Sequence, residues 1–558
     1  MPDRPWWQTG VIYQIAVPSF ADSNGDGWGD LRGIIERLDH LAGTDSSLGI
    51  DAIWLSPINV TPFGDFGYDV ADYRTIDPRF GTMADLQDLL VACHDRGVRV
   101  MMDLVLNHTS EAHPWFTQSR SSRDNHKRDW YVWRDGRPHR RPPNEWLAVV
   151  EGSAWQYDHA TGQYYYHAFL PFQPDLNWRN PEVRHEMLDV ARFWLEKGVD
   201  GFRLDLVNFL YEDERLRDNP RRRFAVRPYL AQRHVHDASQ PESLKAAADL
   251  RRVADEFSER ALMGEVFTDR PEDCVAYLGD GADRLHLSFY LEFVRQRWSA
   301  EGFRNAVQWL EDHLPGCGWP CYYLDNHDLV RSYTRLGGWS ADARARVAAT
   351  MLLTLRGTPI VYYGQELGMV QSRIPRGRMR DPVGRRFWPL PVGRDGARTP
   401  MQWSGDTGAG FSTAEPWLPV DRSYRKRNVA IEDADPGSLL SWYRQLLRAR
   451  RDHPALREGS LRMIGGAPRH VFAYTRECEV ERMAVLLNFS GCEKVVRLPE
   501  ATRSWSPLLS TAGRAQPCGS ACTLAPHEAL ILEVCSRSAW VPTAPVSGPS
   551  RLARCRRA

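Results

Sequence analysis

The sequence predicts an α/β protein built on a (β/α)8 TIM barrel, with an inserted domain after the third strand and a C-terminal antiparallel β-sandwich. Two observations predict the barrel and its insert. Short apolar runs alternate with helical patterns between residues 11 and 364, and one connection is far longer than the others. A third observation predicts the sandwich, because mainly short strand patterns follow residue 465. Alternation of strands and helices favours a parallel sheet, and eight such units favour a closed barrel.

The eight predicted strands are short runs of β-branched, aromatic and aliphatic residues bounded by turn residues, as expected for buried parallel strands. Helical patterns lie between most of them, for example at residues 83–97 and 181–198. No sequence repeat underlies the alternation. In chain order the strands are residues 11–17, 51–57, 98–106, 199–205, 261–267, 285–290, 321–328 and 358–364.

The connection after the third strand is rich in Trp, Tyr, His, Arg and Pro and is too long for a simple loop. We therefore expect a small domain at residues 108–177, between the two parts of the barrel at 1–107 and 178–464. The connections after the fourth and eighth strands are also long. All three lie at the carboxyl rim of the barrel, where active sites are built.

The C-terminal part follows a last predicted helix at residues 438–456. We expect its domain at residues 465–535, where turn residues separate short strand patterns. Residues 536–558 are rich in Pro, Ser and Arg, a composition that predicts a disordered tail. The strand patterns of the C-terminal domain are 470–476, 482–490, 494–499 and 529–534.

The composition argues against several classes of partner. With 71 basic and 71 acidic residues, the net charge gives no reason to expect nucleic acid or an anionic membrane. The N-terminus lacks the pattern of a secretory signal, and no apolar run is long enough to span a bilayer. The 10 cysteines show no zinc-ligand spacing and are expected to be reduced thiols. We therefore expect a cytoplasmic protein, either monomeric or homodimeric.

Carboxyl side chains stand at the ends of three predicted strands. Asp205 ends the fourth, Glu265 lies in the fifth and Asp328 ends the seventh. Buried carboxylates are costly, so stability seldom explains them in apolar strands. A single one would be read as a helix cap or an arginine partner. Three that converge on one rim, beside Arg203 and His327, indicate a functional site.

Two neighbouring carboxyl groups suit the cleavage of a glycosidic bond, in which one is an ionised nucleophile and the other a protonated acid. Arg203 lies two residues before Asp205 on the same strand face, so its charge is expected to lower the pKa of Asp205. The apolar neighbours of Glu265 are expected to raise its pKa. Asp328, next to His327, is placed to bind sugar hydroxyls and to stabilise a developing oxocarbenium ion.

Four segments resemble those of the α-amylase family of glycoside hydrolases: DLVLNHT, GFRLD, GEVF and YLDNHD, in the family's order along the barrel. The resemblance extends from Gly10 to about residue 535 and implies a retaining double displacement. By position, it implies that Asp205 is the nucleophile, Glu265 the acid/base and Asp328 the transition-state stabiliser. It also implies that the residues holding the sugar at the point of cleavage are His108, His327 and Arg203.

Three further segments, FGYDVADY, DGARTPMQW and QPDLNW, resemble the α-glucosidase and oligo-1,6-glucosidase branch of that family. In that branch the residues matching Asp69 and Arg398 clamp the terminal non-reducing glucose, and we expect Tyr68 to bind substrate beside them. Such a clamp closes one end of the cleft. The resemblance therefore implies an exo-acting enzyme that removes single glucose units from small oligosaccharides or glucosides, with no organic cofactor.

The segment DSNGDGWGDLRG, residues 22–33, has oxygen-bearing side chains at alternating positions, as in loops that bind a hard divalent cation. Gly33 stands where a helix–loop–helix calcium sensor has a bidentate Glu, which argues against a sensor. The α-glucosidase branch has an ion loop after its first strand, so the resemblance implies one structural Ca²⁺ (or Mg²⁺). A metal-free polar turn is the alternative. The implied ligands are Asp22, Asn24, Asp26, the carbonyl of Trp28, and Asp30.

Linkage preference depends on the residue after the nucleophile, which in this branch tends to be Val in α-1,6-specific enzymes and Thr or Ala in α-1,4-specific ones. Here it is Leu206, which matches neither. The insert at residues 208–242 resembles that of bacterial α-glucosidases acting on short α-1,4 substrates, some of which transfer glucose to alcohols. We therefore favour an α-1,4 preference with transglucosylation, and an oligo-1,6-glucosidase is the alternative.

Two other relatives share part of the pattern. An isomerase of the trehalose-synthase type has RTPMQW and the same three acids, and it differs in how its pocket closes. The non-catalytic transporter partners lack an intact set of acids and carry a membrane span. This chain has the acids and shows no such span, which disfavours that relative.

Overall fold

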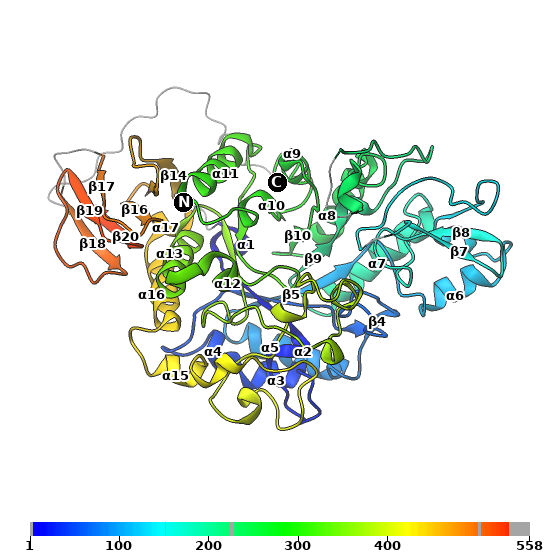
Figure 1. Cartoon of the computed structure of the whole chain (residues 1–558), viewed down its shortest axis with the longest axis horizontal. Coiled ribbons are helices and arrows are strands. Elements are labelled where there is room, and N and C mark those ends of the chain that lie inside the picture. Colours follow the sequence, from blue (N-terminus) through cyan, green and yellow to red (C-terminus); the bar gives the residue numbers. More distant parts are fainter. Residues whose placement is uncertain (1–3, 151, 224–227, 500–503, 535–558) are drawn as a thin grey trace.

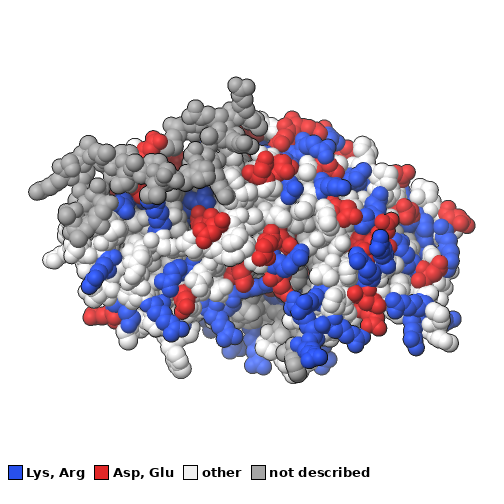
Figure 2. Space-filling model, turned by 90° about the horizontal axis from the view of Figure 1, so that it is seen from above, with Lys and Arg blue, Asp and Glu red and all other residues white. Residues whose placement is uncertain are grey.

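The computed structural model describes residues 4–150, 152–223, 228–499 and 504–534. The barrel lies in the middle of the molecule, with the insert on one side of it and the C-terminal sheets on the other (Figure 1). The predicted tail at residues 536–558 falls outside the described residues. Figure 2 shows Lys and Arg side chains interspersed with Asp and Glu, in keeping with the equal numbers of basic and acidic residues.

Eight parallel strands form the barrel sheet, in the order β11, β10, β9, β5, β2, β1, β13, β12. Each lies inside a strand predicted from the sequence, so the fold class and all eight strands are confirmed. At the two ends of this order, the rings of Phe289, next to β11, and Tyr323 of β12 pack with centroids 4.8 Å apart. The bounds are β1 Ile12–Ile15, β2 Ala52–Leu55, β5 Arg99–Val105, β9 Gly201–Asp205, β10 Ala261–Gly264, β11 Leu287–Ser288, β12 Cys321–Tyr323 and β13 Thr358–Tyr362.

Apolar side chains fill the barrel from within and cover it from outside. Ile12, Trp54, Met101, Met263 and Ile360, from five different strands, belong to one interior cluster. A larger cluster lies between the strands and the surrounding helices. Burial on both faces explains why the strands read as continuous apolar runs. Since the interior is packed, polar side chains on the strands gather near its carboxyl rim.

The helices follow local sequence signals. α5 (Met83–His94) begins with a capping box between Thr82 and Asp85, and α7 (Pro181–Glu196) begins with an Asn180 cap and proline at its first position. The helix predicted at 438–456 is instead two helices, α16 (Leu439–Asp452) and α17 (Pro454–Glu458), because proline cannot continue the hydrogen-bond pattern. The other α-helices are α1 Trp6–Thr9, α2 Val17–Phe20, α3 Leu31–Glu36, α4 Leu38–Leu41, α6 Pro114–Ser121, α8 Pro241–Asp255, α9 Pro271–Ala276, α10 Leu291–Val294, α11 Ala300–His313, α12 Ser332–Gly337, α13 Ala341–Thr354, α14 Pro382–Arg386 and α15 Val429–Asp433.

Two small sheets stand above the barrel rim. β3 (Asn59–Val60) and β4 (Asp72–Ile76), which the sequence pattern did not predict, pair antiparallel and close the loop at residues 61–71. Inside the predicted insert, three strands form an antiparallel sheet in the order β6, β8, β7. These strands are β6 Trp133–Arg134, β7 Trp155–Asp158 and β8 Gln163–Tyr166.

The C-terminal strands form a five-stranded antiparallel sheet, in the order β14, β15, β16, β20, β18, and a separate pair, β17 and β19. The four predicted strands are confirmed, and three further strands complete the two sheets. The four are β15 Val471–Glu477, β16 Arg482–Asn488, β17 Lys494–Arg497 and β20 Ala529–Val534. The three are β14 Ser460–Met463, β18 Trp505–Ser510 and β19 Ala521–Leu524.

One cysteine departs from the prediction of reduced thiols, since Cys317 is disulfide-bonded. Among the described residues, seven cysteines are free: Cys93, Cys274, Cys321, Cys478, Cys492, Cys518 and Cys522. In the same part of the chain, every helix is too short or too polar to cross a membrane.

Candidate active site

Three neighbouring strands bring the main charged groups together at the carboxyl rim. Arg203 and Asp205 lie two residues apart on β9 and therefore on the same face of the strand. Asp103 on β5 stands opposite Arg203 in the strand register, and Glu265 follows directly after β10. Pairing of β5, β9 and β10 thus assembles residues that lie far apart in the sequence.

One guanidinium joins three carboxylates in this cluster. Arg203 has no exposed surface, and its Nη1 donates to Asp103 Oδ1 and to Asp205 Oδ1, each at 2.6 Å. Its Nη2 donates to Glu265 Oε2. Because a single planar group bonds both Asp205 and Glu265, the two carboxyl groups are held close together.

Asp103 fixes the arginine from the opposite side. Its Oδ2 accepts hydrogen bonds from Trp54 Nε1 at 2.9 Å and from the Tyr68 hydroxyl at 3.1 Å. The Arg203 guanidinium also lies 5.3 Å from the centroid of the Trp54 ring. The bonds of Nη1 and Nη2 to three carboxylates leave the guanidinium little freedom, so it positions both Asp205 and Glu265.

Burial raises the pKa of both Asp205 and Glu265, while Arg203 acts in the opposite direction on each. This confirms the prediction for Glu265. For Asp205 the prediction was wrong in its net direction, because burial and the neighbouring charge of Glu265 outweigh the effect of Arg203. Raised pKa values on two neighbouring carboxyl groups favour a state in which one is ionised and the other protonated. Cleavage of a glycosidic bond requires that combination.

The second oxygen of Asp205 is available for chemistry. Asp205 is only 4% exposed, and among the described residues its Oδ2 has no hydrogen-bond partner, although the atom is buried. A buried carboxylate oxygen without a donor is costly unless a ligand completes the site. The side chain lines a cavity into which this oxygen can act as a nucleophile.

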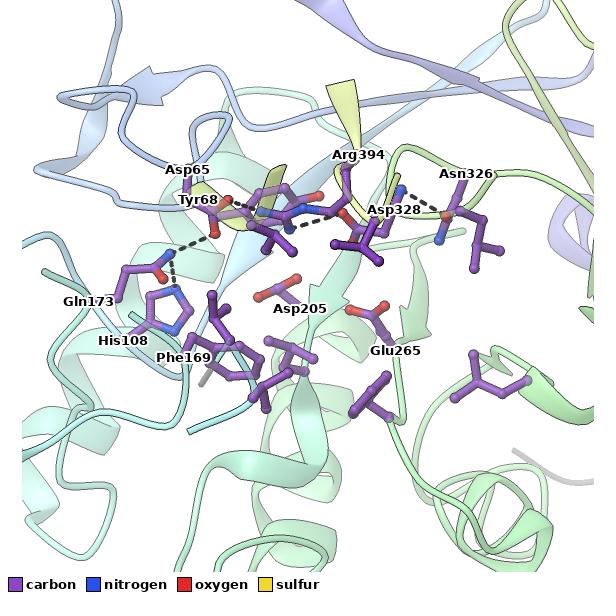
Figure 3. A pocket seen from close by; sticks show the side chains of 18 of the residues that line it. Asp65, Tyr68, His108, Phe169, Gln173, Asp205, Glu265, Asn326, Asp328 and Arg394 are labelled. Atoms are coloured by element: carbon purple, nitrogen blue, oxygen red, sulfur yellow. Dashed lines mark hydrogen bonds and ion pairs between the residues drawn. The ribbon is translucent and has the colours of Figure 1, made fainter. Parts of the chain in front are cut away.

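The cavity has a volume of about 240 Å³, which is below the roughly 300–1,000 Å³ typical of sites for drug-sized ligands. It therefore suits a molecule of monosaccharide size. In Figure 3, Asp205 and Glu265 lie side by side in its middle, with Tyr68, Asp65 and Arg394 on one side. The polar lining residues are Asp65, Tyr68, His108, Gln173, Asp205, Glu265, Asn326, Asp328 and Arg394. The apolar and aromatic lining residues include Val149, Val150, Phe169, Leu206, Phe267, Leu291, Tyr323, Leu329, Val383 and Val392.

The closed side of the cavity is formed by an ion pair that the sequence analysis missed. Arg394 Nη2 donates to Asp65 Oδ1 at 2.6 Å, and both side chains line the cavity. Asp65 lies in the loop closed by β3 and β4, and Arg394 lies in the long connection after β13. Gln173 of the insert also donates to Asp65 Oδ2, at 3.2 Å. Three separate segments therefore meet at this side.

Asp69 and Arg398, the residues expected to form a clamp, do not line the cavity. Asp69 is buried and uses its carboxylate to hold its own loop, accepting from Thr61 Oγ1 and from the backbone amides of Gly64 and Asp65. Burial raises its pKa to about 6. The structure thus leaves both predicted clamp residues out of the lining. Four positions earlier in each case, just outside the quoted segment, a residue of the same type does line the cavity: Asp65 and Arg394. The local sequence does not distinguish the two members of either pair.

Arg398 instead supports Asp328 from behind. Its Nη2 donates to Asp328 Oδ1 at 2.7 Å, and its Nε donates to the carbonyl of His327 at 2.9 Å. Burial alone would raise the pKa of Asp328, but neighbouring cations, Arg394 and Arg398 among them, lower it well below its ordinary range. The surroundings of Asp328 therefore favour its ionised form, whereas burial raises the pKa of Asp205 and Glu265.

Two histidines complete the polar lining. His327 lies parallel to the Tyr68 ring with centroids 5.2 Å apart, and its Nδ1 contacts Gln14 Nε2 at 2.8 Å. Burial lowers the pKa of His327 to about 3 and that of His108 to about 4, so both imidazoles are neutral. His108 Nε2 contacts Gln173 Nε2 at 3.2 Å. Neutral imidazoles can exchange hydrogen bonds with sugar hydroxyls without adding charge.

Of the nine residues predicted for catalysis or substrate binding, the structure places five in the cavity lining and two directly beneath it. The lining residues are Tyr68, His108, Asp205, Glu265 and Asp328, and those beneath are Arg203 and His327. The sequence analysis missed Asp65, Phe169, Gln173, Asn326 and Arg394, which also line it.

Leu206 lines the cavity immediately after Asp205 and has an unusual backbone conformation, with φ 47° and ψ 43°. This left-handed region costs a leucine roughly 1–2 kcal/mol. The turn lets the chain leave β9 sharply, and the amide of Val207 donates to the carbonyl of Glu265 at 3.1 Å. The strained turn therefore links the ends of β9 and β10, which carry the two reacting carboxyl groups.

The loop after β1 contains oxygen donors suited to a hard cation, and these also shape the loop. Asp22, Asn24 and Asp26 each accept the backbone amide two residues further on, at 3.1, 2.9 and 2.8 Å. Asp30 caps α3 by accepting the amide of Gly33 at 2.7 Å. Within the described part of the chain, no group of three or more His, Cys, Asp or Glu side chains is arranged to hold a metal. Carboxylate, amide and carbonyl oxygens are nonetheless the donors that Ca²⁺ and Mg²⁺ prefer.

Comparisons with known proteins agree with this geometry. The family described as "Alpha amylase, catalytic domain" matches residues 14–459. A "Probable alpha-glucosidase" of Rhizobium meliloti is 44% identical over 511 residues, 89% of this chain and 92% of that protein. An "Oligo-1,6-glucosidase" of Parageobacillus thermoglucosidasius is 38% identical over 534 residues, 89% of this chain and 93% of that protein.

Solved structures share the whole architecture. The α-glucosyl transfer enzyme XgtA is 41% identical, with a TM-score of 0.89 over 96% of this chain and all of its own. The trehalulose synthase MutB of Pseudomonas mesoacidophila MX-45 is 34% identical, with a TM-score of 0.88 over 96% of this chain and 100% of its own. Mutants of MutB have been solved with sucrose and with glucose.

Proposed function

Because this chain belongs to the α-amylase family of glycoside hydrolases, among the relatives named α-glucosidase and oligo-1,6-glucosidase, we propose that it removes single glucose units from the non-reducing ends of short α-glucosides with retention of configuration. The observation that carries the proposal is the Arg203 guanidinium, which bonds both Asp205 and Glu265 at the floor of a sugar-sized cavity.

Two displacements follow from this arrangement. Asp205 attacks the anomeric carbon through its unpartnered Oδ2, while Glu265 donates its proton to the leaving oxygen. The departing group takes that proton, and Glu265 is then the base that activates water or an alcohol to release glucose from Asp205. Retaining enzymes hold the two carboxyl groups about 5–5.5 Å apart, and inverting ones roughly 6.5–9.5 Å. Bridging by one guanidinium favours the shorter separation.

The exo mode is supported by the Asp65–Arg394 pair, which closes one side of the cavity. An ion pair there leaves both groups able to bond hydroxyls of a terminal sugar, and it blocks a chain that continues in that direction. Asp328, held ionised between Arg394 and Arg398, would stabilise positive charge on the sugar as the bond breaks. Together these groups favour a single glucose unit over an internal segment of a polymer.

For the linkage we favour α-1,4 cleavage with transfer of glucose to acceptors other than water. Leu206, Phe267, Leu329 and Val392 line the cavity with apolar surface, which disfavours ordered water and favours an organic acceptor. A relative titled an α-glucosyl transfer enzyme is 41% identical. An oligo-1,6-glucosidase is the second candidate, supported by the relatives of that name. A maltose isomerase of the trehalose-synthase type is the third.

Proton NMR of the purified protein with maltose, followed from the first seconds, tests these candidates together. Our proposal expects α-glucose to appear before β-glucose, with transfer products beside it. Conversion of maltose to trehalose would establish the isomerase instead. If isomaltose is cleaved and maltose is not, the linkage assignment fails while retention can still be read from the first anomer. If β-glucose appears first, the double displacement is wrong.

We also propose that one Ca²⁺ or Mg²⁺ stabilises the loop at residues 22–30, through the oxygens of Asp22, Asn24, Asp26 and Asp30 and the Trp28 carbonyl. The side chain of Asp30 also accepts the amide of Gly33, which ties the end of the loop to α3. Removal of divalent ions should lower the melting temperature by several degrees, and Ca²⁺ or Mg²⁺ should restore it. An Asp26→Asn variant should lose that response. Equal melting curves with and without chelator would contradict the ion site.

A further inference from the structure

Arg394, which forms the closed side of the sugar cavity, lies on a long connection and not on a barrel strand. Its guanidinium contacts three carboxylates: Asp65 at 2.6 Å, Asp381 at 2.8 Å and Asp328 at 3.2 Å. Asp65 and Asp328 line the cavity, whereas Asp381 does not. The position of Arg394 between Asp65 and Asp328 therefore depends on Asp381, the one contact that lies outside the cavity lining.

Asp381 makes more hydrogen bonds to Arg394 than the other two carboxylates. Its Oδ1 accepts from Arg394 Nη2 at 2.8 Å and from Nε at 3.1 Å, and its Oδ2 accepts from the backbone amide of Arg394 at 2.6 Å. It is only 2% exposed, so these bonds are shielded from water. One carboxylate thus fixes both the backbone and the side-chain fork of Arg394.

The same carboxylate anchors an apolar part of the cavity. Asp381 caps α14 by accepting the amides of Val383 and Gly384, each at 3.2 Å, and Val383 lines the cavity. Val383 also packs with Val150 and Leu170 of the insert in a small separate cluster. Asp381 therefore holds both Arg394 on the polar side of the cavity and Val383 on its apolar side.

The loop between Asp381 and Arg394 is closed by an interlocked neck. Asp395 accepts hydrogen bonds from the backbone amides of Arg380 at 2.7 Å and of Asp381 at 3.0 Å. Asp381 in turn accepts a hydrogen bond from the backbone amide of Arg394, so the two ends of the loop are bonded in both directions. The two chain segments of the neck contact each other at Gly384 and Gly393, since a Cβ on Gly393 would lie 2.7 Å from the Cα of Gly384. Only glycine allows this approach, so the neck has little freedom to shift.

We propose that Asp381 is a positioning residue for the reaction, which holds Arg394 so that its fork binds Asp65 and the sugar and does not collapse onto Asp328. This inference rests on the proposed function, because it assigns Arg394 to the binding of glucose. Without Asp381, the closest remaining carboxylates for Arg394 are Asp65 and Asp328. A tighter bond to Asp328 would occupy an oxygen that is needed for the sugar.

An Asp381→Asn variant tests the assignment, with Asp395→Asn as its matched control. Asn at this position has one accepting oxygen and no charge, so it can accept from the guanidinium of Arg394 or from its backbone amide but not from both. Its hold on the guanidinium is therefore weakened. Asp395 bonds only backbone amides of the same neck and does not touch the guanidinium, and an Asn there keeps one accepting oxygen. Both substitutions weaken hydrogen bonds within the loop, but only Asp381→Asn weakens those to the guanidinium of Arg394.

Two measurements separate positioning from general damage: KM and kcat for α-glucosides with different leaving groups, and the dissociation constant of glucose by calorimetry. We expect Asp381→Asn to raise every KM and the glucose dissociation constant by one common factor of about ten, the size of one charge-assisted hydrogen bond. Its kcat should fall by a smaller factor. Asp395→Asn should change both quantities less than threefold.

Unchanged glucose affinity in Asp381→Asn would overturn the proposal, as would an equal loss in Asp395→Asn, which would show that only the loop's shape matters. If Asp381→Asn does not fold, Asp381→Glu serves in its place, because it keeps the charge but displaces the carboxylate by one methylene group and should also weaken glucose binding more than Asp395→Asn does. Failure of the proposed function has a different signature: wild-type protein would bind glucose, with the predicted loss in the variant, and cleave no α-glucoside.

Discussion

The two sides of the sugar cavity are held in different ways. Asp205 and Glu265 stand at the ends of paired barrel strands, where the ladder between β9 and β10 fixes their spacing. Asp65 and Arg394 stand on loops separated by more than half of the chain, and an ion pair joins them. The groups that we propose to react therefore rest on the rigid sheet, and those that we propose to bind the sugar rest on connections that must hold each other. Barrel enzymes can change substrate by altering such loops and keep their chemistry.

Removal of the carboxyl groups of Asp205 and Glu265 should give the largest loss of activity. It tests the part of the comparison that concerns the barrel strands. Asp205→Asn should lower kcat by about 10⁴-fold or more, since no other group can form the covalent intermediate. Glu265→Gln should lower it by about 10²–10⁴-fold for substrates with poor leaving groups, and far less for an α-glucosyl fluoride. Both variants should melt within a few degrees of the wild type. If Glu265→Gln slows all substrates equally, its role as the acid is wrong.

The loop side is tested by a matched pair, Asp65→Asn and Asp69→Asn. Asp65→Asn weakens the ion pair with Arg394 and should raise KM by about 10–100-fold, as expected for one charge-assisted hydrogen bond. Asp69→Asn should change KM by less than about threefold, because Asp69 bonds only its own loop, and its main effect should be a lower melting temperature. Steady-state kinetics and thermal melts of both proteins check this. The reverse order of KM effects would restore Asp69 as the sugar ligand.

The dependence of kcat/KM on pH should change when Glu265 is substituted and not when Asp65 is, although this effect is smaller than those on kcat and KM. Activity requires ionised Asp205 and protonated Glu265, so it falls at low pH as Asp205 gains a proton and at high pH as Glu265 loses one. Because burial raises the pKa of both groups, the two limbs should lie above the ordinary carboxyl range of about 3.9–4.3. Asp65→Asn should keep the profile's shape, whereas Glu265→Gln should remove the alkaline limb. An alkaline limb that persists in Glu265→Gln belongs to another group.

Substitution of Leu206, which directly follows Asp205, should give the smallest effect of these variants. A β-branched Val fits the left-handed conformation less well, so Leu206→Val should lower the free energy of unfolding by about 1 kcal/mol. Leu206→Asn, which tolerates this conformation, is the control. Because the side chain lines the cavity, the ratio of maltose to isomaltose cleavage should change severalfold in both variants. An unchanged ratio would mean that Leu206 shapes the turn but does not select the linkage.

The barrel could be predicted because each strand carries its own signal, a short apolar run bounded by turn residues. Asp205 and Glu265 were found for the same reason, since parallel strands deliver their ends to one rim. The unpredicted strands are short or only partly buried, and their pairing partners define them more than their own residues. They are β3, β4, β6, β7, β8, β14, β18 and β19.

By itself the sequence determined the barrel, the family and the convergence of Asp205 and Glu265 on one rim, because these depend on local patterns along the chain. Tertiary structure decided which acid and which arginine line the cavity. Asp65 and Asp69 lie on one loop, and Arg394 and Arg398 on another, so composition and spacing treat the members of each pair alike. The net pKa of Asp205 was decided in the same way. Burial depends on what the folded chain places around a group, and here it outweighs the nearest charge in the sequence.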